Sequence, residues 1–246
     1  MRIPAAIRSL RHYEAVRGAA LATLNRARQP LRGQRKLLAD YLRRHPTAKL
    51  NIGCGNNLLH GWLNTEYSAP LRPGVLFLDA RRPFPMPDAS FDYVFSEHMI
   101  EHIPLSSGAH MLRECHRILK PGGRIRIATP RLEFLMELMT GPAAVHRAYA
   151  DYHYADLEEE PSVRTPARIL NDYHRRWGHE FVYDEPTLRL LLERAGFEKV
   201  KVMPLNVSDD TNLRGIENDG RMPEGMLALT TIVIEAEKRR RSSLRS

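Results

Sequence analysis

The sequence predicts an α/β fold: a seven-stranded, mostly parallel sheet with helices on both faces, and a basic helical extension at the N-terminus. From residue 49 onward, short apolar runs alternate with loops and with segments of helical periodicity, which is the order expected of such a sheet. With 246 residues and 43% hydrophobic content, the chain can bury one sizeable core. We therefore expect one domain over residues 47–236, with its last two strands forming an antiparallel pair.

Seven apolar runs are the strand candidates, at 50–52, 63–67, 75–78, 93–95, 125–129, 200–203 and 229–234. A helix between the fourth and fifth runs carries apolar residues on one face, namely Leu112, Cys115, Ile118 and Leu119. It is expected to stop at Pro121-Gly122-Gly123. A later helix has Asp184 as its cap, Pro186 in its first turn and Gly196 just past its end.

The two ends of the chain are basic. Residues 1–46 predict a helical extension, with one amphipathic helix over 8–24 and a second over 34–44, and residues 237–246 predict a basic, disordered tail. A helical lid on the main domain is the favoured interpretation of the extension. Peripheral contact with a membrane or another anionic surface, and an arginine-rich transit sequence, are the alternatives.

The charge distribution argues against a nucleic-acid substrate. The formal net charge is +8, but residues 1–44 carry +9 and residues 236–246 carry +4, so the remainder carries −5. A nucleic-acid channel through the fold would need the opposite distribution. Cys54 and Cys115 are the only cysteines, which is ordinary for reduced thiols, and no apolar run approaches the ~20 residues of a membrane span. We expect a cytoplasmic protein.

A glycine turn follows the first strand in the segment KLNIGCGNNLL, residues 49–59. Glycine lets the backbone approach a ligand closely and donate its amides. A dinucleotide fingerprint needs a third glycine three positions after Gly55, where this chain has Leu58. The turn therefore disfavours NAD and FAD.

Acidic residues close the next two strands. Glu66 ends the second strand, where a carboxylate can accept hydrogen bonds from both hydroxyls of a ribose. Asp79 ends the third strand and is placed to meet the exocyclic amine of an adenine. Because ligands bind at the carboxyl edge of open α/β sheets, the turn and the two acids predict an adenosine-containing cofactor.

With these features, the sequence resembles the class I S-adenosylmethionine-dependent methyltransferases, in particular a compact bacterial group that is methyltransferase type 11-like and shares a Gly-Trp-x-Asn-x-acid segment. Four blocks carry the resemblance: LNIGCG (50–55), GWLNTE (61–66), LDARRPFPMPDASFDYVFSEHMIEHI (78–103) and ILKPGGRIRIATP (118–130). The resemblance implies a Rossmann-like fold and S-adenosylmethionine as cofactor. It also implies a cofactor site formed by Asn51, Gly53, Cys54, Gly55, Glu66, Asp79, Ala80, Ser96, Glu97 and His98.

Within that site, the resemblance assigns Glu66 to the ribose, Asp79 and Ala80 to the adenine, and 96–98 to the methionyl end. The chain departs from the common pattern at Asn51, where an acid is frequent, and at Asn57, where a glycine is frequent. Glu66 replaces the usual Asp and follows Gly53 by thirteen residues. The first helix of the fold must therefore be short or absent.

Histidine is the natural proton acceptor for a methyl transfer to a hydroxyl or a protonated amine. His98 follows the fourth strand, and a second cluster within 171–184 contains two more histidines. The catalytic candidates are His98, His174 and His179, and the substrate-binding candidates are His102, Arg175 and Trp177. No metal site is predicted. Residues 98–102 match the His-x-x-Glu-His pattern of zinc proteases, but Pro104 breaks the helix which that pattern needs.

By resemblance, the favoured activity is an O-methyltransferase acting on a sugar or glycoconjugate. Aromatic side chains suit stacking on such an acceptor or on an aromatic ring, namely Tyr149, Tyr152, His153, Tyr154 and Trp177. N- or C-methylation of an aromatic or quinone-like acceptor is the alternative, and a non-catalytic cofactor-binding partner protein is an alternative from another class. The turn-rich segment 206–226 is either part of the substrate side or a disordered connector.

Overall fold

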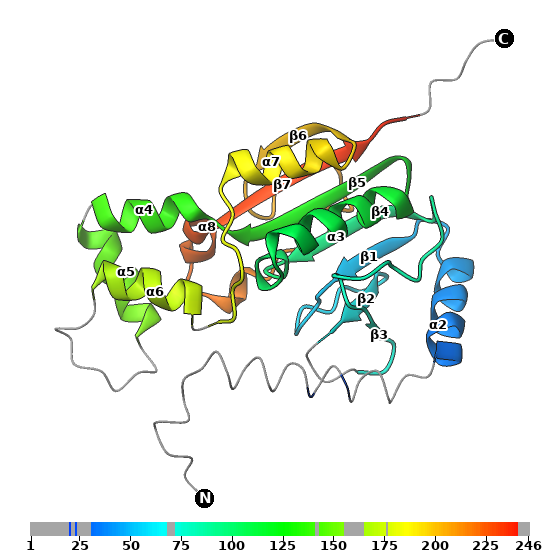
Figure 1. The fold of residues 1–246 in the computed structure, drawn as a ribbon, viewed down its shortest axis with the longest axis horizontal. Coiled ribbons are helices and arrows are strands. Elements are labelled where there is room, and N and C mark those ends of the chain that lie inside the picture. The colour runs from blue at the N-terminus through cyan, green and yellow to red at the C-terminus, as the bar shows by residue number, and fades with distance from the viewer. Residues whose placement is uncertain are drawn as a thin grey trace, which may run out of the picture.

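The computed structural model describes Ala20, Thr23 and residues 31–67, 72–140, 143–154, 165–175 and 177–240. Its centre is one sheet of seven strands in the order β3-β2-β1-β4-β5-β7-β6 (Figure 1). The strands are β1 (Lys49–Ile52), β2 (Leu63–Glu66), β3 (Leu76–Phe77), β4 (Phe91–Glu97), β5 (Leu119–Pro130), β6 (Phe197–Met203) and β7 (Thr231–Lys238). β7 runs antiparallel to both of its neighbours and the other pairings are parallel. The predicted seven-stranded, mostly parallel sheet is confirmed.

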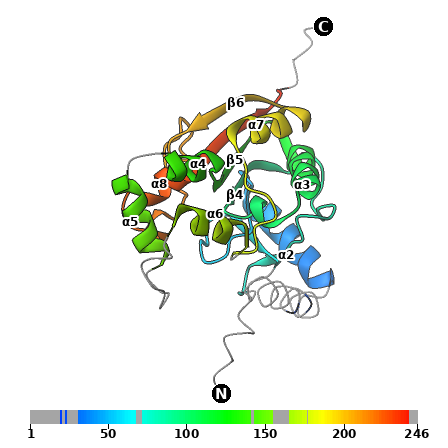
Figure 2. The same cartoon turned by 60° about the vertical axis from the view of Figure 1, so that its left-hand side comes forward.

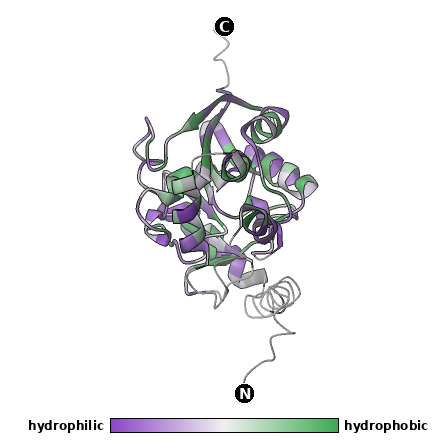
Figure 3. Cartoon of the chain, turned by 90° about the vertical axis from the view of Figure 1, so that its left-hand side faces the viewer, coloured by the Kyte–Doolittle hydropathy of each residue, from purple (hydrophilic) through white to green (hydrophobic). Residues whose placement is uncertain are grey.

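The main apolar core lies between the sheet and two helices, α3 (Leu105–Ile118) and α7 (Glu185–Arg194). Helix α2 (Leu31–Arg44) packs near β3 and adds Leu38 and Tyr41 to this core. The predicted helix 34–44 is therefore confirmed, with an earlier start, whereas the predicted helix 8–24 lies outside the described residues apart from Ala20 and Thr23. Polar and apolar residues alternate along the helices, as buried and solvent faces require (Figure 3).

The other face of the sheet is covered by an irregular segment, residues 204–225. A second apolar cluster on this face joins Trp62 and Phe95 to Leu213 and Ile216 of that segment. No helix intervenes between β1 and β2, where residues 53–62 form turns, so the expectation of a short or absent first helix is confirmed. The covering segment takes over part of the surface that a helix would bury.

The predicted boundary between α3 and the fifth strand is wrong. The helix ends at Ile118, and Leu119 begins β5, so Pro121-Gly122-Gly123 lies inside the strand as a bulge opposite β4. Gly122 has a φ of 82°, and a side chain on Gly123 would come within 3.0 Å of the Asp92 carbonyl on β4. The glycines therefore serve a close approach of two strands, which the helix-stop pattern does not distinguish from a helix end.

The last strand also begins and ends later than predicted. Residues 226–230 form a short helix, α8 (Met226–Thr230), and β7 begins at Thr231. β7 continues to Lys238, so the first two residues of the predicted tail belong to the sheet. Polar residues do not end this strand because their side chains find partners across the sheet, as when Glu237 accepts a hydrogen bond from Lys199 at 3.1 Å.

A group of helices beyond the carboxyl ends of β4 and β5 was not predicted. It consists of α4 (Leu132–Thr140), α5 (Ala143–His153), α6 (Pro166–Arg175) and α8 (Figure 2). We call it the helical cap. Its own core includes Phe134, Tyr149, Tyr154 and Tyr173. The predicted stacking role of Tyr149 and Tyr154 therefore meets a correction, because both rings are buried against neighbouring helices.

Among the described residues, no helix is long and apolar enough to cross a membrane.

Candidate active site

The glycine turn lies at the carboxyl end of β1. Gly53 and Gly55 have φ values of 68° and 47°, a region that favours glycine. A side chain on Gly53 would come within 2.3 Å of the Met99 side chain, whereas at Gly55 the same position is open space. The Glu66 carboxylate accepts hydrogen bonds from the backbone amides of Gly55 at 2.9 Å and of Tyr67 at 2.7 Å. The turn and the acid thus meet, as the sequence predicts.

Two residues assigned to the cofactor site lie behind the turn and support it. The Asn51 side-chain amide donates to the Asn57 carbonyl and to Asn64 Oδ1, both at 2.9 Å. Cys54 is buried, and burial, followed by the charge of Glu66, raises the pKa of its thiol to about 12. The Asn51 amide is engaged by the turn and the Cys54 thiol is buried, so both shape the turn.

Asp79 and Ala80 follow β3 on the neighbouring loop. The guanidinium of Arg81 donates two hydrogen bonds to the Asp79 carboxylate, from Nε at 2.8 Å and from Nη2 at 3.0 Å. Burial alone would raise the pKa of Asp79, but these bonds lower it below its ordinary value. Arg81 also lies over the Tyr67 ring, 4.6 Å from its centroid, and Ala80 is buried in the core. At the position of the predicted adenine contact, the Asp79 carboxylate is therefore paired with Arg81.

The end of β4 supplies Ser96 and Glu97. The Ser96 hydroxyl is buried and has no hydrogen-bond partner among the described residues. Glu97 accepts hydrogen bonds from the Asn57 side chain at 2.9 Å and from the Asn218 amide at 3.0 Å. Glu97 therefore joins the glycine turn to the segment 204–225, which places that segment beside the predicted cofactor site and excludes a disordered connector.

These residues fit S-adenosylmethionine. The left-handed turn leaves open space at Gly55, where backbone amides can meet a ligand. The Glu66 carboxylate at the adjacent strand end can accept hydrogen bonds from a diol, and the buried Ser96 hydroxyl, which has no partner among the described residues, can make a polar contact. All three lie at the carboxyl edge of the parallel strands, where α/β sheets bind ligands.

His98 follows β4 directly and has a φ of 47°, which is uncommon for a residue with a side chain. Its amide donates to the Ala128 carbonyl at 2.8 Å, which holds this conformation. On the ring, Nε2 lies 3.0 Å from the Thr231 hydroxyl and Nδ1 lies 3.4 Å from Glu101 Oε1. The backbone thus aims the imidazole at two polar partners.

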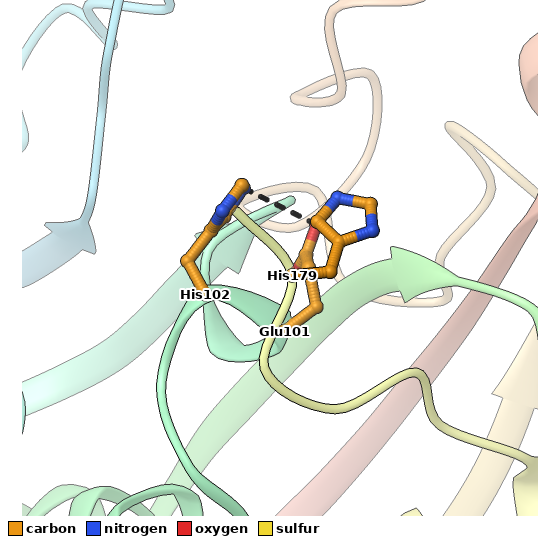
Figure 4. A group of neighbouring side chains, drawn as sticks. All are labelled: Glu101, His102 and His179. Atoms are coloured by element: carbon orange, nitrogen blue, oxygen red, sulfur yellow. Dashed lines mark ion pairs between the residues drawn. The ribbon is translucent and has the colours of Figure 1, made fainter. Parts of the chain in front are cut away.

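Glu101 is the centre of a histidine cluster (Figure 4). It lies in a single 3-10 turn, η2 (Ile100–His102), and is fully buried. Its Oε2 accepts a hydrogen bond from the Thr129 hydroxyl at 3.0 Å, and His102 Nε2 lies 3.9 Å from its Oε1. Burial alone would raise the pKa of Glu101, but His98, His102 and His179 together lower it to about 2.

His179 comes from a distant part of the chain. The amides of Glu180 and Phe181 donate to the Glu101 carbonyl at 2.7 and 3.2 Å, which fixes this segment against η2. The rings of His179 and His102 are 4.9 Å apart. Burial, more than its charged neighbours, lowers the pKa of His179 to about 4. At neutral pH it is therefore a neutral imidazole beside an ionised carboxylate.

Of the other predicted residues of this region, two lie apart from the cluster, whereas the Trp177 ring lies 5.8 Å from that of His179. His174 and Arg175 are exposed at the end of α6. Trp177 packs edge-on against His153 and Tyr173, with centroids 5.1 and 5.2 Å away. Of the three catalytic candidates, the structure thus brings His98 and His179 together and leaves His174 outside.

No role of Glu101 is predicted from the sequence, and Thr129, Thr231 and Arg81 are not among the predicted site residues. A signal exists for Glu101: it stands between Ile100 and Ile103, at a position whose neighbours are buried. A carboxylate there needs partners, and the adjacent histidines are the nearest candidates.

Residues 50–127 match a family model described as a methyltransferase domain. A relative from Mycolicibacterium smegmatis, described as a probable S-adenosylmethionine-dependent methyltransferase, is 46% identical over 115 residues, which is 46% of this chain and 31% of the relative. The chain thus spans less than a third of the length of this curated relative.

Among solved structures, a methyltransferase from Thermotoga maritima is 20% identical with a TM-score of 0.47, covering 84% of this chain and 91% of that one. One from Archaeoglobus fulgidus is 19% identical with a TM-score of 0.46, covering 84% and 96%. The family match and the strand order, rather than these two structures, carry the assignment. Residues 50–127 thus match a methyltransferase domain, and this match and the strand order support a class I S-adenosylmethionine-dependent methyltransferase with S-adenosylmethionine as cofactor.

Proposed function

We propose that this protein transfers the methyl group of S-adenosylmethionine to a hydroxyl of a sugar or glycoconjugate, with His98 as the proton acceptor. The observation that carries the proposal is the pairing of His98 with the buried Glu101, at 3.4 Å, directly after β4. The cofactor supplies a methyl group bound to a positively charged sulfur. A hydroxyl that accepts it must lose a proton, and an imidazole oriented by a carboxylate suits that task near neutral pH.

Glu101 supports this role in two ways. Its carboxylate, with a pKa lowered to about 2, stays ionised and stabilises a protonated imidazole. Its second oxygen is held by the Thr129 hydroxyl at 3.0 Å, so the carboxylate is fixed relative to the His98 ring. Thr231, at 3.0 Å from His98 Nε2, marks the position that the acceptor hydroxyl would take over.

Methyl-transfer assays with His98→Gln test the proposal, with the exposed His60→Gln as the control. Loss of a general base is expected to lower kcat about 10²–10⁴-fold while calorimetric binding of S-adenosylmethionine stays within a few-fold of wild type. A set of sugar, glycolipid and phenolic acceptors identifies the class. Unchanged kcat in the variant, with cofactor binding intact, would refute the role of His98.

A groove in the helical cap favours a second candidate. It has a volume of about 500 Å³, and it is lined mainly by apolar side chains of α4, α5 and α8, including Phe134, Tyr149, Met226 and Leu229. An apolar, quinone-like acceptor that undergoes C- or N-methylation would bury its ring system in such a groove. In that case Leu229→Glu would raise KM for apolar acceptors and leave a sugar acceptor unaffected.

A further inference from the structure

We propose that Glu101, His102 and His179 bind one divalent transition-metal ion, with Zn²⁺ as the best match, at the acceptor side of the site. One ligand atom from each residue lies within 4.8 Å of the other two (Figure 4). The binding of the ion stands independently of the proposed function. Its use, which is to hold the oxygen of the acceptor, rests on that function.

The distances leave room for an ion. Zn²⁺ binds imidazole nitrogen and carboxylate oxygen at about 2.0–2.2 Å, which puts ligand atoms about 3.3 Å apart in a tetrahedral site. His102 Nε2 is 3.9 Å from Glu101 Oε1 and all the ligand atoms lie within 4.8 Å of one another, so a tetrahedral site needs a closure of up to about 1.5 Å. The His102 side chain is 39% exposed and can turn inward, whereas Glu101 and His179 are already held in place.

The unpartnered atoms also point to a cation. Glu101 Oε1 and His179 Nδ1 are buried and have no hydrogen-bond partner among the described residues. Oε1 faces His98 Nδ1 at 3.4 Å and His102 Nε2 at 3.9 Å, and both contacts are long for a buried carboxylate; a metal ion bound between this oxygen and the neutral His179 imidazole would pair both atoms.

The surroundings resemble those of a built metal site. The Thr129 hydroxyl donates to the second oxygen of Glu101 at 3.0 Å, which orients the carboxylate. The backbone bonds from Glu180 and Phe181 fix the His179 segment. The rings of Tyr173 and Trp177 lie 5.7 and 5.8 Å from that of His179, and they shield one side. His102 leaves the other side open.

The donor set selects the type of ion. Two imidazoles and one carboxylate suit Zn²⁺ and other first-row transition metals, whereas Mg²⁺ and Ca²⁺ prefer oxygen ligands. Three protein ligands with an open position are typical of catalytic zinc sites. The arrangement is not that of the zinc proteases, because His98 and His102 do not lie on one face of a helix. The backbone of His98 has a left-handed conformation, and His98 precedes a three-residue 3-10 turn. Glu101 is a ligand here rather than a free base.

The test is calorimetric titration of the chelator-treated full chain with Zn²⁺, followed by Co²⁺ as a spectroscopic probe. We expect one ion per chain and a visible absorption band that reports a site with nitrogen and oxygen ligands. Since loss of an outer-shell partner typically costs 10–100-fold in metal affinity, Glu101→Gln, His102→Gln and His179→Gln are expected to lower it by at least about 100-fold. His60→Gln is the matched control, expected to bind as wild type does.

Two measurements keep the outcome clear. His102→Gln alters an exposed side chain, so its circular dichroism and Tm without metal are expected to equal those of wild type, which separates lost binding from lost folding. Binding of S-adenosylmethionine is titrated in parallel. Absence of stoichiometric Zn²⁺, or equal affinity in wild type and His102→Gln, overturns the metal site. If cofactor binding and methyl transfer persist in that case, the proposed function stands without it.

Discussion

Arg126 links the sheet to the segment that covers its second face, and its removal is expected to destabilise the protein strongly. The side chain is fully buried on β5 and donates hydrogen bonds to the carboxylates of Glu217 and Glu235. It also donates to the carbonyls of Val207 at 2.9 Å and Pro204 at 3.2 Å. One carboxylate of β7, and one carboxylate and two carbonyls of the segment 204–225, therefore depend on one guanidinium.

The magnitude follows from this arrangement. Arg126→Met removes the cation and leaves two carboxylates without compensation in the interior, for which about 3–5 kcal/mol is the typical loss when a buried ion pair is broken. In a protein of this size about 1 kcal/mol corresponds to 2–4 °C, so Tm is expected to fall by about 10 °C. Because Asn218 bonds to Glu97 at 3.0 Å, affinity for S-adenosylmethionine is expected to fall as well.

Urea denaturation followed by circular dichroism measures the loss. Arg113→Met, at an exposed position of α3, is the matched control and is expected to change the free energy of unfolding by less than about 0.5 kcal/mol. A triple variant, Arg126→Met with Glu217→Gln and Glu235→Gln, is expected to recover part of the loss, because no charge is left buried. A change below about 1 kcal/mol for Arg126→Met alone would refute the reasoning.

Two further predictions concern the site. Gly53→Ala is expected to lower both stability and cofactor affinity, because its new methyl group would meet the Met99 side chain. Gly74→Ala is the control, because Gly74 has a φ of 83° and no atom within 4 Å of the new methyl group, so this variant carries only the backbone strain. Equal losses in the two variants would contradict the role of the contact with Met99. The pKa of His179 is lowered from 6.5 to about 4 in the folded protein, so the unfolded chain binds the proton first as the pH falls. The free energy of unfolding is therefore expected to fall by about 3 kcal/mol between pH 6.5 and 4. Unfolding curves across that range, compared with those of His179→Gln, check this, and equal slopes would argue against it.

The parts of the fold that were predicted depend on local signals. The cap of α7 is one such signal: Asp184 accepts a hydrogen bond from the Thr187 amide at 2.9 Å, and Pro186 lies in the first turn. By contrast, the helical cap buries residues of α4, α5 and α6 mainly against each other, which no local periodicity reveals. The contacts between these helices set the boundaries there.

In the candidate site, too, residues with a local sequence signal were predicted and a residue that depends on distant contacts was not. Gly53, Gly55 and Glu66 are recognisable because each closes a strand at a known spacing, and they meet in the structure. Glu101 is not, because a lone carboxylate in a sequence reads as a solvated residue. Its burial is explained by neighbouring histidines and Thr129 together with a histidine 78 positions later, whose segment is held to Glu101 by the backbone bonds at 180 and 181.

The close packing of Met99 on Gly53 joins the glycine turn to the histidine cluster. Met99 stands between His98 and the turn that carries Glu101, and its side chain fills the space above the glycine turn. A movement of either turn therefore changes the packing of the other. By thermodynamic linkage, any factor by which the cofactor alters affinity at the histidine cluster returns unchanged as an effect of that cluster's ligand on the cofactor. A substitution of Met99 is therefore expected to change this coupling between the glycine turn and the histidine cluster.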